Sequence, residues 1–229
     1  MASNNFPRNT PPANSVVLSD MLKKYASVDL LKQDFGAEII PYKQVEYLES
    51  TGTQWIDTGV VFSSNSGWDV TFMPLQNPNL NLWVMGTQNT SGVVYGIRIT
   101  SSKELQAQYG PTKIIVAGSN VGVRRICVLN STSLTLNDSS VIRSGGPGDF
   151  TQTIVLFAWR WRGGSVAGLS YCRIYAAKLY DNQVFVRDFI PVRFTNENNQ
   201  TEGALYDKVS QQLFRNAGTG SFIIGPDLN

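Results

Sequence analysis

The sequence predicts an all-β protein: a two-sheet antiparallel jelly-roll sandwich with a short extended and helical N-terminal appendage. Two observations predict this fold. From about residue 42 onward, short runs rich in Val, Ile, Thr, Tyr, Phe and Trp alternate with clusters of Gly, Asn and Ser. The clusters recur roughly every 8 to 15 residues, a spacing typical of sandwiches, and no apolar stripe of helical period interrupts them.

Residues 1–43 are predicted to be an appendage to this sandwich. Residues 1–15 are polar and contain three prolines, which favours an extended tail. Apolar side chains then recur at spacings of three and four, as expected for one amphipathic helix or two short ones: Leu18, Met21, Leu22, Tyr25, Val28, Leu31 and Phe35. Two interpretations stay open, because this stripe could pack on the chain's own sandwich or bind another chain.

Residues 44–229 are predicted to form the sandwich itself. In order, the expected strand segments are 55–62, 67–75, 82–88, 92–100, 104–110, 112–118, 123–130, 133–138, 139–144, 152–162, 171–194, 203–209, 212–218 and 222–225. The segment 171–194 is expected to be a hairpin that turns at Asp181 and Asn182. In the first strand, alternation places Gln54, Ile56 and Thr58 on one face and Trp55, Asp57 and Gly59 on the other, so that one of the two faces can enter the sandwich.

Composition and charge exclude several function classes. The net charge is only +2 and no basic run is present, so nucleic-acid binding is not expected. No apolar stretch approaches the roughly 18 residues of a membrane span, so no membrane insertion is expected. The N-terminal "MASNNFPRNTPPANS" lacks the pattern of a secretory signal, and we expect the protein to stay in the cytoplasm unless it leaves with a particle.

We do not expect an enzyme. The chain contains no histidine, the commonest general base and zinc ligand, so no histidine can activate a serine or cysteine nucleophile. The Glu-x-Asp-x-x-Glu pattern of glucanases with this type of fold is absent, and Glu46 and Glu49 would point to opposite faces of a strand.

No cofactor or metal site is expected either. The possible oxygen ligands Asp57, Asp69, Asp138 and Asp149 lack the spacing of a calcium loop. Cys127 and Cys172 lie in strand-like runs, where each is either a buried free thiol or half of a disulfide.

Glycan binding is the remaining activity for which the sequence offers candidate residues: Arg160, Arg162, Trp68 and Trp83. In "FAWRWRGG", alternation puts Arg160 and Arg162 on one face and two tryptophans, at 159 and 161, on the other. Those tryptophans are either core residues with the arginines facing solvent, or part of a sugar-binding platform. Trp68 and Trp83 follow polar loops, so each is either packed or a rim aromatic.

Three segments carry a resemblance to a known group of domains: "YLESTGTQWIDTGV" (47–60), "KLYDNQVFVRDFIPVR" (178–193) and "GALYDKVSQQLFRNAGTGSFIIGPD" (203–227). They resemble the laminin-G-like, concanavalin A-like jelly-roll domains of gut bacteria and their phages, over essentially residues 44–229. The opening and closing blocks are expected to pair, since the first and last strands of such sandwiches often neighbour one another. With its N-terminal tail, the chain is similar to head-fibre or capsid-decoration proteins of crAss-like bacteriophages.

The resemblance implies a virion structural protein at the virion surface. Its N-terminus would bind capsid or other virion proteins, it would be a homo-oligomer, and its lectin-like domain would bind host or mucosal glycans. The alternatives are a tail-associated receptor-binding protein and a bacterial carbohydrate-binding module, because the same fold serves all of them.

Overall fold

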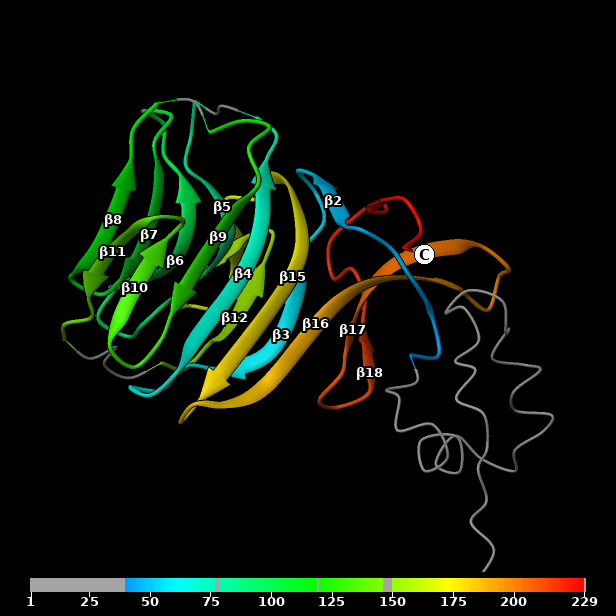
Figure 1. Cartoon of the computed structure of the whole chain (residues 1–229). Coiled ribbons are helices and arrows are strands. Elements are labelled where there is room, and N and C mark those ends of the chain that lie inside the picture. Colours follow the sequence, from blue (N-terminus) through cyan, green and yellow to red (C-terminus); the bar gives the residue numbers. More distant parts are fainter. Residues whose placement is uncertain (1–39, 77–78, 119, 146–149, 229) are drawn as a thin grey trace, which may run out of the picture.

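The computed structural model describes residues 40–76, 79–118, 120–145 and 150–228. These residues form two sheets, of 11 and 8 strands, and contain no helix, so the predicted all-β sandwich is confirmed (Figure 1). Nothing in this part of the chain is a helix long and apolar enough to cross a membrane. The predicted amphipathic stripe from Leu18 to Phe35 and the candidate ligand Asp149 lie outside the described residues.

The larger sheet is built from antiparallel strands. Its main path runs in the order β11 (Ser139–Ile142), β10 (Ser133–Leu136), β9 (Arg125–Leu129), β4 (Gly67–Pro74), β15 (Tyr171–Asp181), β16 (Val184–Thr195), β17 (Thr201–Asp207) and β18 (Gln212–Phe214). Three short strands join its side: β1 (Lys43–Gln44), β2 (Leu48–Thr51) and β19 (Ile223–Ile224).

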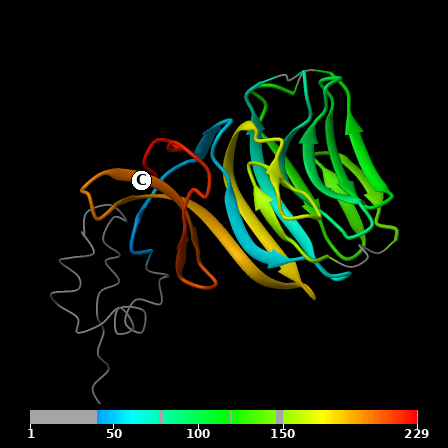
Figure 2. The same cartoon turned by 180° about the vertical axis from the view of Figure 1, so that it is seen from behind.

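The smaller sheet lies behind the larger one in Figure 1 and is nearer the reader in Figure 2. Its main path runs in the order β14 (Val166–Ala167), β13 (Trp159–Arg160), β5 (Leu82–Gln88), β6 (Val94–Ile99), β7 (Leu105–Tyr109) and β8 (Thr112–Val116). β12 (Thr153–Leu156) pairs with both β5 and β3 (Ile56–Val61). The pairing of β13 with β5 is parallel, and all other pairings among these strands are antiparallel.

Large apolar side chains from both sheets fill the space between them. Trp68 is fully buried there, stacked on Phe62 with ring centroids 5.8 Å apart, and its indole N–H donates to Cys127 Sγ at 3.4 Å. Burying a side chain of this size stabilises the fold by roughly 2–3 kcal/mol. The interpretation of Trp68 as a glycan-binding rim residue is therefore wrong, because β4 alternation directs its ring into the core.

Both cysteines are buried free thiols, so the disulfide alternative is not realised. Cys172 Sγ lies 3.0 Å from Ser170 Oγ.

The opening and closing sequence blocks pair, as predicted. β19 pairs with β2, and Gln54 Nε2 donates to the carbonyl of Ser221 at 3.0 Å. Asn216 Oδ1 accepts the N–H groups of Trp55 at 3.2 Å and Gly218 at 2.8 Å. A Cβ at Gly218 would lie 2.1 Å from the Thr53 carbonyl oxygen, which explains the glycine in this block.

In the first strand, the face that carries Gln54, Ile56 and Thr58 is the one that enters the sandwich, because all three side chains are buried.

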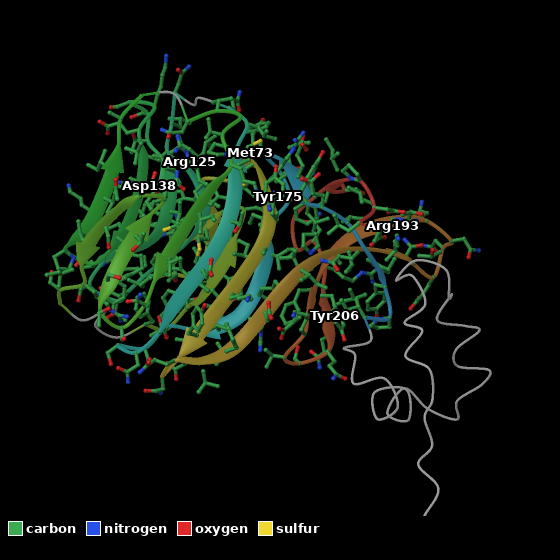
Figure 3. All side chains as sticks on the ribbon, in the orientation of Figure 1. Met73, Arg125, Asp138, Tyr175, Arg193 and Tyr206 are labelled. Carbon is green, nitrogen blue, oxygen red and sulfur yellow. The ribbon has the colours of Figure 1, made fainter. Side chains whose placement is uncertain are left out.

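Beyond the sandwich, β16 and β17 carry a second, smaller apolar cluster. Arg193 and Tyr206 mark this extension in Figure 3, and Ile40 and Tyr42 pack against its buried members, which include Tyr206. The expected domain boundary after residue 43 therefore falls inside β1, and residues 40–43 belong to the packed unit.

The β15–β16 hairpin forms as predicted, with its turn one residue later than expected. Asn182 and Gln183 form the turn, both with positive φ, while Asp181 still pairs with Val184.

Candidate functional site

The outer face of the smaller sheet holds the candidate site. Side chains alternate along a strand, so when Tyr95 and Ile97 enter the core, Gly96 and Arg98 must face outward. The same alternation on β7 turns Gln106 and Gln108 outward. The outward-facing side chains on these strands therefore include Arg98, Gln106, Gln108 and, opposite Gln108 on β8, Lys113.

The β13–β14 hairpin is held against the edge of β5. Phe157, with φ of 66°, turns the chain, and two backbone hydrogen bonds between Trp161 and the 164–165 segment close the hairpin. The backbone N–H of Trp83 donates to the backbone carbonyl of Gly168 at 2.8 Å. A Cβ at Gly168 would lie 2.4 Å from Trp83 Cδ1, so the backbone after β14 lies directly on this indole.

Three tryptophans stack in a row between β5 and the hairpin. The Trp83 and Trp159 rings lie 5.1 Å apart at 21°, and Trp159 and Trp161 lie 4.2 Å apart at 40°. Trp83 is 2% exposed and Trp159 9%, whereas Trp161 is 44% exposed. Trp161 therefore presents an indole to solvent on a support of two buried rings, an arrangement that offers a large, rigid apolar surface.

A line of polar groups runs across β6 and β7 beside this row. Arg98 Nε and Nη2 donate to Gln106 Oε1 at 2.9 and 2.8 Å, and Gln106 Nε2 donates to Gln108 Oε1 at 3.2 Å. The Arg98 guanidinium lies 5.1 Å from the centre of the Trp83 ring. Burial lowers the pKa of Arg98, but an arginine remains protonated at neutral pH.

Arg160 fastens the hairpin to β3. It is 9% exposed, its Nη1 donates to Asp57 Oδ2 at 2.8 Å, and it also bonds Thr153. Burial acts to raise the pKa of Asp57, but the hydrogen bonds from Thr153, Gly59 and Arg160 together lower it. Since the carboxylate is thereby held ionised against the arginine, this half-exposed ion pair joins the hairpin to β3.

Arg162 lies at the tip of the hairpin and is exposed. Its backbone N–H points to Gln88 Oε1 at 3.5 Å, and its Nη1 donates to the Thr90 carbonyl at 3.3 Å. The guanidinium therefore sits on the same side of β5 as the tryptophan row.

The structure brings three of the four predicted glycan-binding residues together and leaves Trp68 in the core. Trp83 and Arg160 are buried supports rather than exposed contacts, so the interpretation that places both arginines in solvent is wrong for Arg160. The sequence predicts that Trp159 and Trp161 share one face. Only Trp161 is exposed, because the hairpin turns directly after this residue.

Sequence reasoning missed Arg98 and Gln106. The polar positions that alternate with apolar ones in "GIRIT" and "ELQAQYG" were the available signal.

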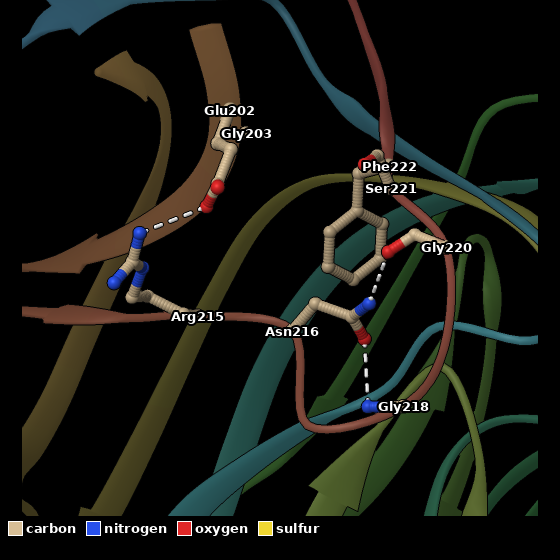
Figure 4. Close-up of a pocket in the computed structure, with 8 residues that line it drawn as sticks. All are labelled: Glu202, Gly203, Arg215, Asn216, Gly218, Gly220, Ser221 and Phe222. Atoms are coloured by element: carbon tan, nitrogen blue, oxygen red, sulfur yellow. Dashed lines mark hydrogen bonds and ion pairs between the residues drawn. The ribbon is translucent and has the colours of Figure 1, made fainter. Parts of the chain in front are cut away.

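A hollow lies elsewhere, between β17 and the loop after β18 (Figure 4). It measures about 390 Å³, and the ion pair between Glu202 and Arg215, at 2.9 Å, lies along its wall. Asn216 Nδ2 donates to the Gly220 carbonyl at 2.8 Å. The one aromatic side chain among the residues that line this hollow, Phe222, is 5% exposed, so the hollow offers no ring for stacking.

Within the ranges described, no group of three or more Cys, Asp or Glu side chains is placed to hold a metal ion.

Comparison with known proteins supports the fold. No family model matches the chain, and no curated protein matches it. Among solved structures, a candidate carbohydrate-binding protein from Bacteroides ovatus superposes with a TM-score of 0.54 at 11% identity, over 82% of this chain. The match covers 62% of that protein, so this chain spans less than two thirds of its length. At this identity the likeness shows a shared β-sandwich fold.

Proposed function

We propose that residues 44–229 form a non-catalytic carbohydrate-binding module that stacks a sugar ring on Trp161. The observation that carries the proposal is the row of three tryptophans, of which two are buried and the third is presented to solvent beside Arg162. An exposed indole on so rigid a support offers a fixed aromatic face on which a sugar ring can stack. The fold shared with a candidate carbohydrate-binding protein is consistent with this proposal.

The surroundings of Trp161 supply hydrogen-bonding groups for sugar hydroxyls. Arg162 lies on one side, with its backbone held by the buried Gln88, and Arg98 and Gln108 lie on the neighbouring strands, joined through the buried Gln106. These groups are mounted on strands or on the fastened hairpin, so little conformational freedom would be lost on binding.

A glycan panel tests this proposal. Full-length protein is screened against neutral and acidic glycans, and each hit is titrated by calorimetry with Trp161→Ala. We expect that variant to weaken binding at least about tenfold, as loss of an aromatic stacking contact of more than ~1.4 kcal/mol would do. Phe185→Ala is the matched control, because Phe185 is 43% exposed on the other sheet. Binding that both variants leave unchanged would contradict the assignment of the site, and no binding to any glycan would contradict the function.

The module is proposed to be non-catalytic because of its carboxylates. Asp57 is the one carboxylate on the strands of the smaller sheet and on the β13–β14 hairpin, and it is engaged by Arg160 and Thr153. Glycoside hydrolysis needs two carboxyl groups roughly 5–10 Å apart across the bond that breaks. New reducing ends released from any bound glycan would overturn this part of the proposal.

We further propose that residues 1–43 attach this module to a capsid or fibre and that copies of the chain associate there. The sequence resemblance and the apolar stripe support this setting. The test is co-sedimentation of full-length protein with phage particles that lack it, using Leu22→Asp and Leu31→Asp as stripe variants and Val184→Asp on the sandwich as control. Sedimentation lost only in the stripe variants is expected, whereas equal sedimentation of all three would refute the anchor.

A further inference from the structure

We infer that the outer face of the smaller sheet selects an acidic glycan, a chain carrying carboxylate or sulfate groups that Arg98 and Arg162 bind. This inference rests on the proposed function, because it names the ligand class of the same site.

The first observation is the balance of charge on this face. Its strands and the β13–β14 hairpin carry Arg98, Lys113, Arg160 and Arg162 against a single carboxylate, Asp57. Asp57 is paired with Arg160, which leaves the other three cations uncompensated there. Within the described residues, no carboxylate comes within ion-pair distance of Arg98, Lys113 or Arg162.

The larger sheet and its extension differ in this respect, because their arginines are largely paired. Five arginines on or next to this sheet face a carboxylate within 4 Å, and Arg125 and Arg143 do not: the five pairs are Arg124 with Glu46, Arg173 with Glu49, Arg187 with Asp207, Arg193 with Asp227 and Arg215 with Glu202. The other described residues carry 11 lysines and arginines and 11 carboxylates, so the excess positive charge of the described part of the chain lies on the smaller sheet and its hairpin.

The second observation is that the Arg98 guanidinium is held in place by some of its N–H groups, while others have no hydrogen-bond partner within the described residues. Arg98 Nε and Nη2 both donate to Gln106 Oε1, and the guanidinium lies over the Trp83 ring. Arg98 Nη1 has no hydrogen-bond partner in the described part of the chain. A guanidinium fixed in this way offers paired N–H donors to a carboxylate or sulfate. Lys113 adds a charge two strands away from β6.

The spacing of the two arginines indicates an extended ligand. Arg98 lies opposite Trp83 and Arg162 lies beside Gln88, five residues further along β5. At about 3.3 Å per residue, these positions are about 16 Å apart, which exceeds the length of one sugar. A polymer with repeated acidic groups can contact both arginines while one ring stacks on Trp161.

The experiment compares polymers that share a backbone and differ in charge. Full-length protein is titrated with polygalacturonate and its fully methyl-esterified form, and with dextran sulfate and dextran, so the two pairs separate carboxylate from sulfate recognition. We expect at least one charged polymer to bind about tenfold or more tightly than its neutral partner, and this preference to shrink as salt screens the charges.

Arg98→Gln and Arg162→Gln should each weaken binding of the preferred polymer by about tenfold, as loss of one charge-assisted contact does. Arg124→Gln is the control, since it removes the same charge from the larger sheet, and it should leave binding unchanged. Equal binding of charged and neutral partners would overturn the inference while the proposed function stands. Equal weakening by all three variants would overturn it as well, because attraction would then be unspecific. No binding to any of the four polymers overturns the inference, and the neutral glycans of the broader panel then decide the function separately.

Discussion

Replacing Gly86 with alanine should disturb the tryptophan row directly. Gly86 lies on β5 beneath two indoles, and an added Cβ would lie 2.9 Å from Trp83 Cε3 and 3.1 Å from Trp159 Cδ1. Ordinary carbon contacts begin near 3.5 Å, so the overlap is about half an ångström with each ring. Both rings are buried and stacked on one another, so neither can move away without shifting the hairpin.

The expected cost follows from two opposing effects. Overpacking a well-filled site costs about 1–3 kcal/mol, while alanine in a strand gains about 0.5–1 kcal/mol over glycine. We therefore expect Gly86→Ala to lower the free energy of unfolding by about 1–2 kcal/mol. Because the shift moves Trp161, glycan binding should also weaken, although Gly86 itself contacts no ligand.

Gly163→Ala is the control for this prediction. Gly163 lies in the hairpin turn, and a Cβ there would meet nothing within 4 Å. Urea unfolding followed by far-UV circular dichroism measures stability, and near-UV circular dichroism reports the environment of the stacked indoles. If Gly86→Ala were as stable as Gly163→Ala and kept the native near-UV spectrum, the tight packing of Gly86 against the two rings would be refuted.

Two further predictions concern the core. Asp207 is fully buried, and its carboxylate accepts N–H groups from Asp188, Val209 and Ser210 and the Ser210 hydroxyl, with Arg187 at 3.7 Å. Asp207→Asn should cost about 3–5 kcal/mol in urea unfolding, because it removes the charge of a buried pair, whereas Ser210→Ala should cost about 1 kcal/mol; equal costs would contradict this. Burial raises the pKa of the Cys127 and Cys172 thiols to about 12, so iodoacetamide at pH 8 should label neither in the native protein and both in urea. Rapid native labelling would contradict their burial.

Much of the fold could be predicted because the relevant signals are local. Alternation in 54–58 correctly placed Gln54, Ile56 and Thr58 on one face, which the structure buries. Clusters of Gly, Asn and Ser marked the turns, and the β15–β16 hairpin was misplaced by one residue only. These features depend on neighbouring residues along one strand, which is information that a sequence carries directly.

The candidate site depended on contacts between distant segments. Trp68 and Trp83 both follow polar loops in the sequence, yet Trp68 enters the sandwich core and Trp83 lies under the β13–β14 hairpin. Arg160 and Arg162 sit two residues apart, and the turn at Trp161 buries one and exposes the other. Local alternation states which residues share a face, but the packing of other segments decides whether that face is covered.

By itself, therefore, the sequence determined the fold class and most of the strand segments, and its resemblance to known domains indicated the pairing of the first and last blocks. The expected single strand 152–162 is instead broken into β12 and β13, because Phe157 has a positive φ. Only the tertiary structure decided that Trp161 is the exposed ring, that Trp83 and Trp159 support it, and that Arg98 lies on the same face. The physical reason is that exposure is a property of packing. A side chain's access to solvent is set by strands and loops that fold together from distant parts of the chain. The residues next to it in sequence do not show which of these segments will cover it.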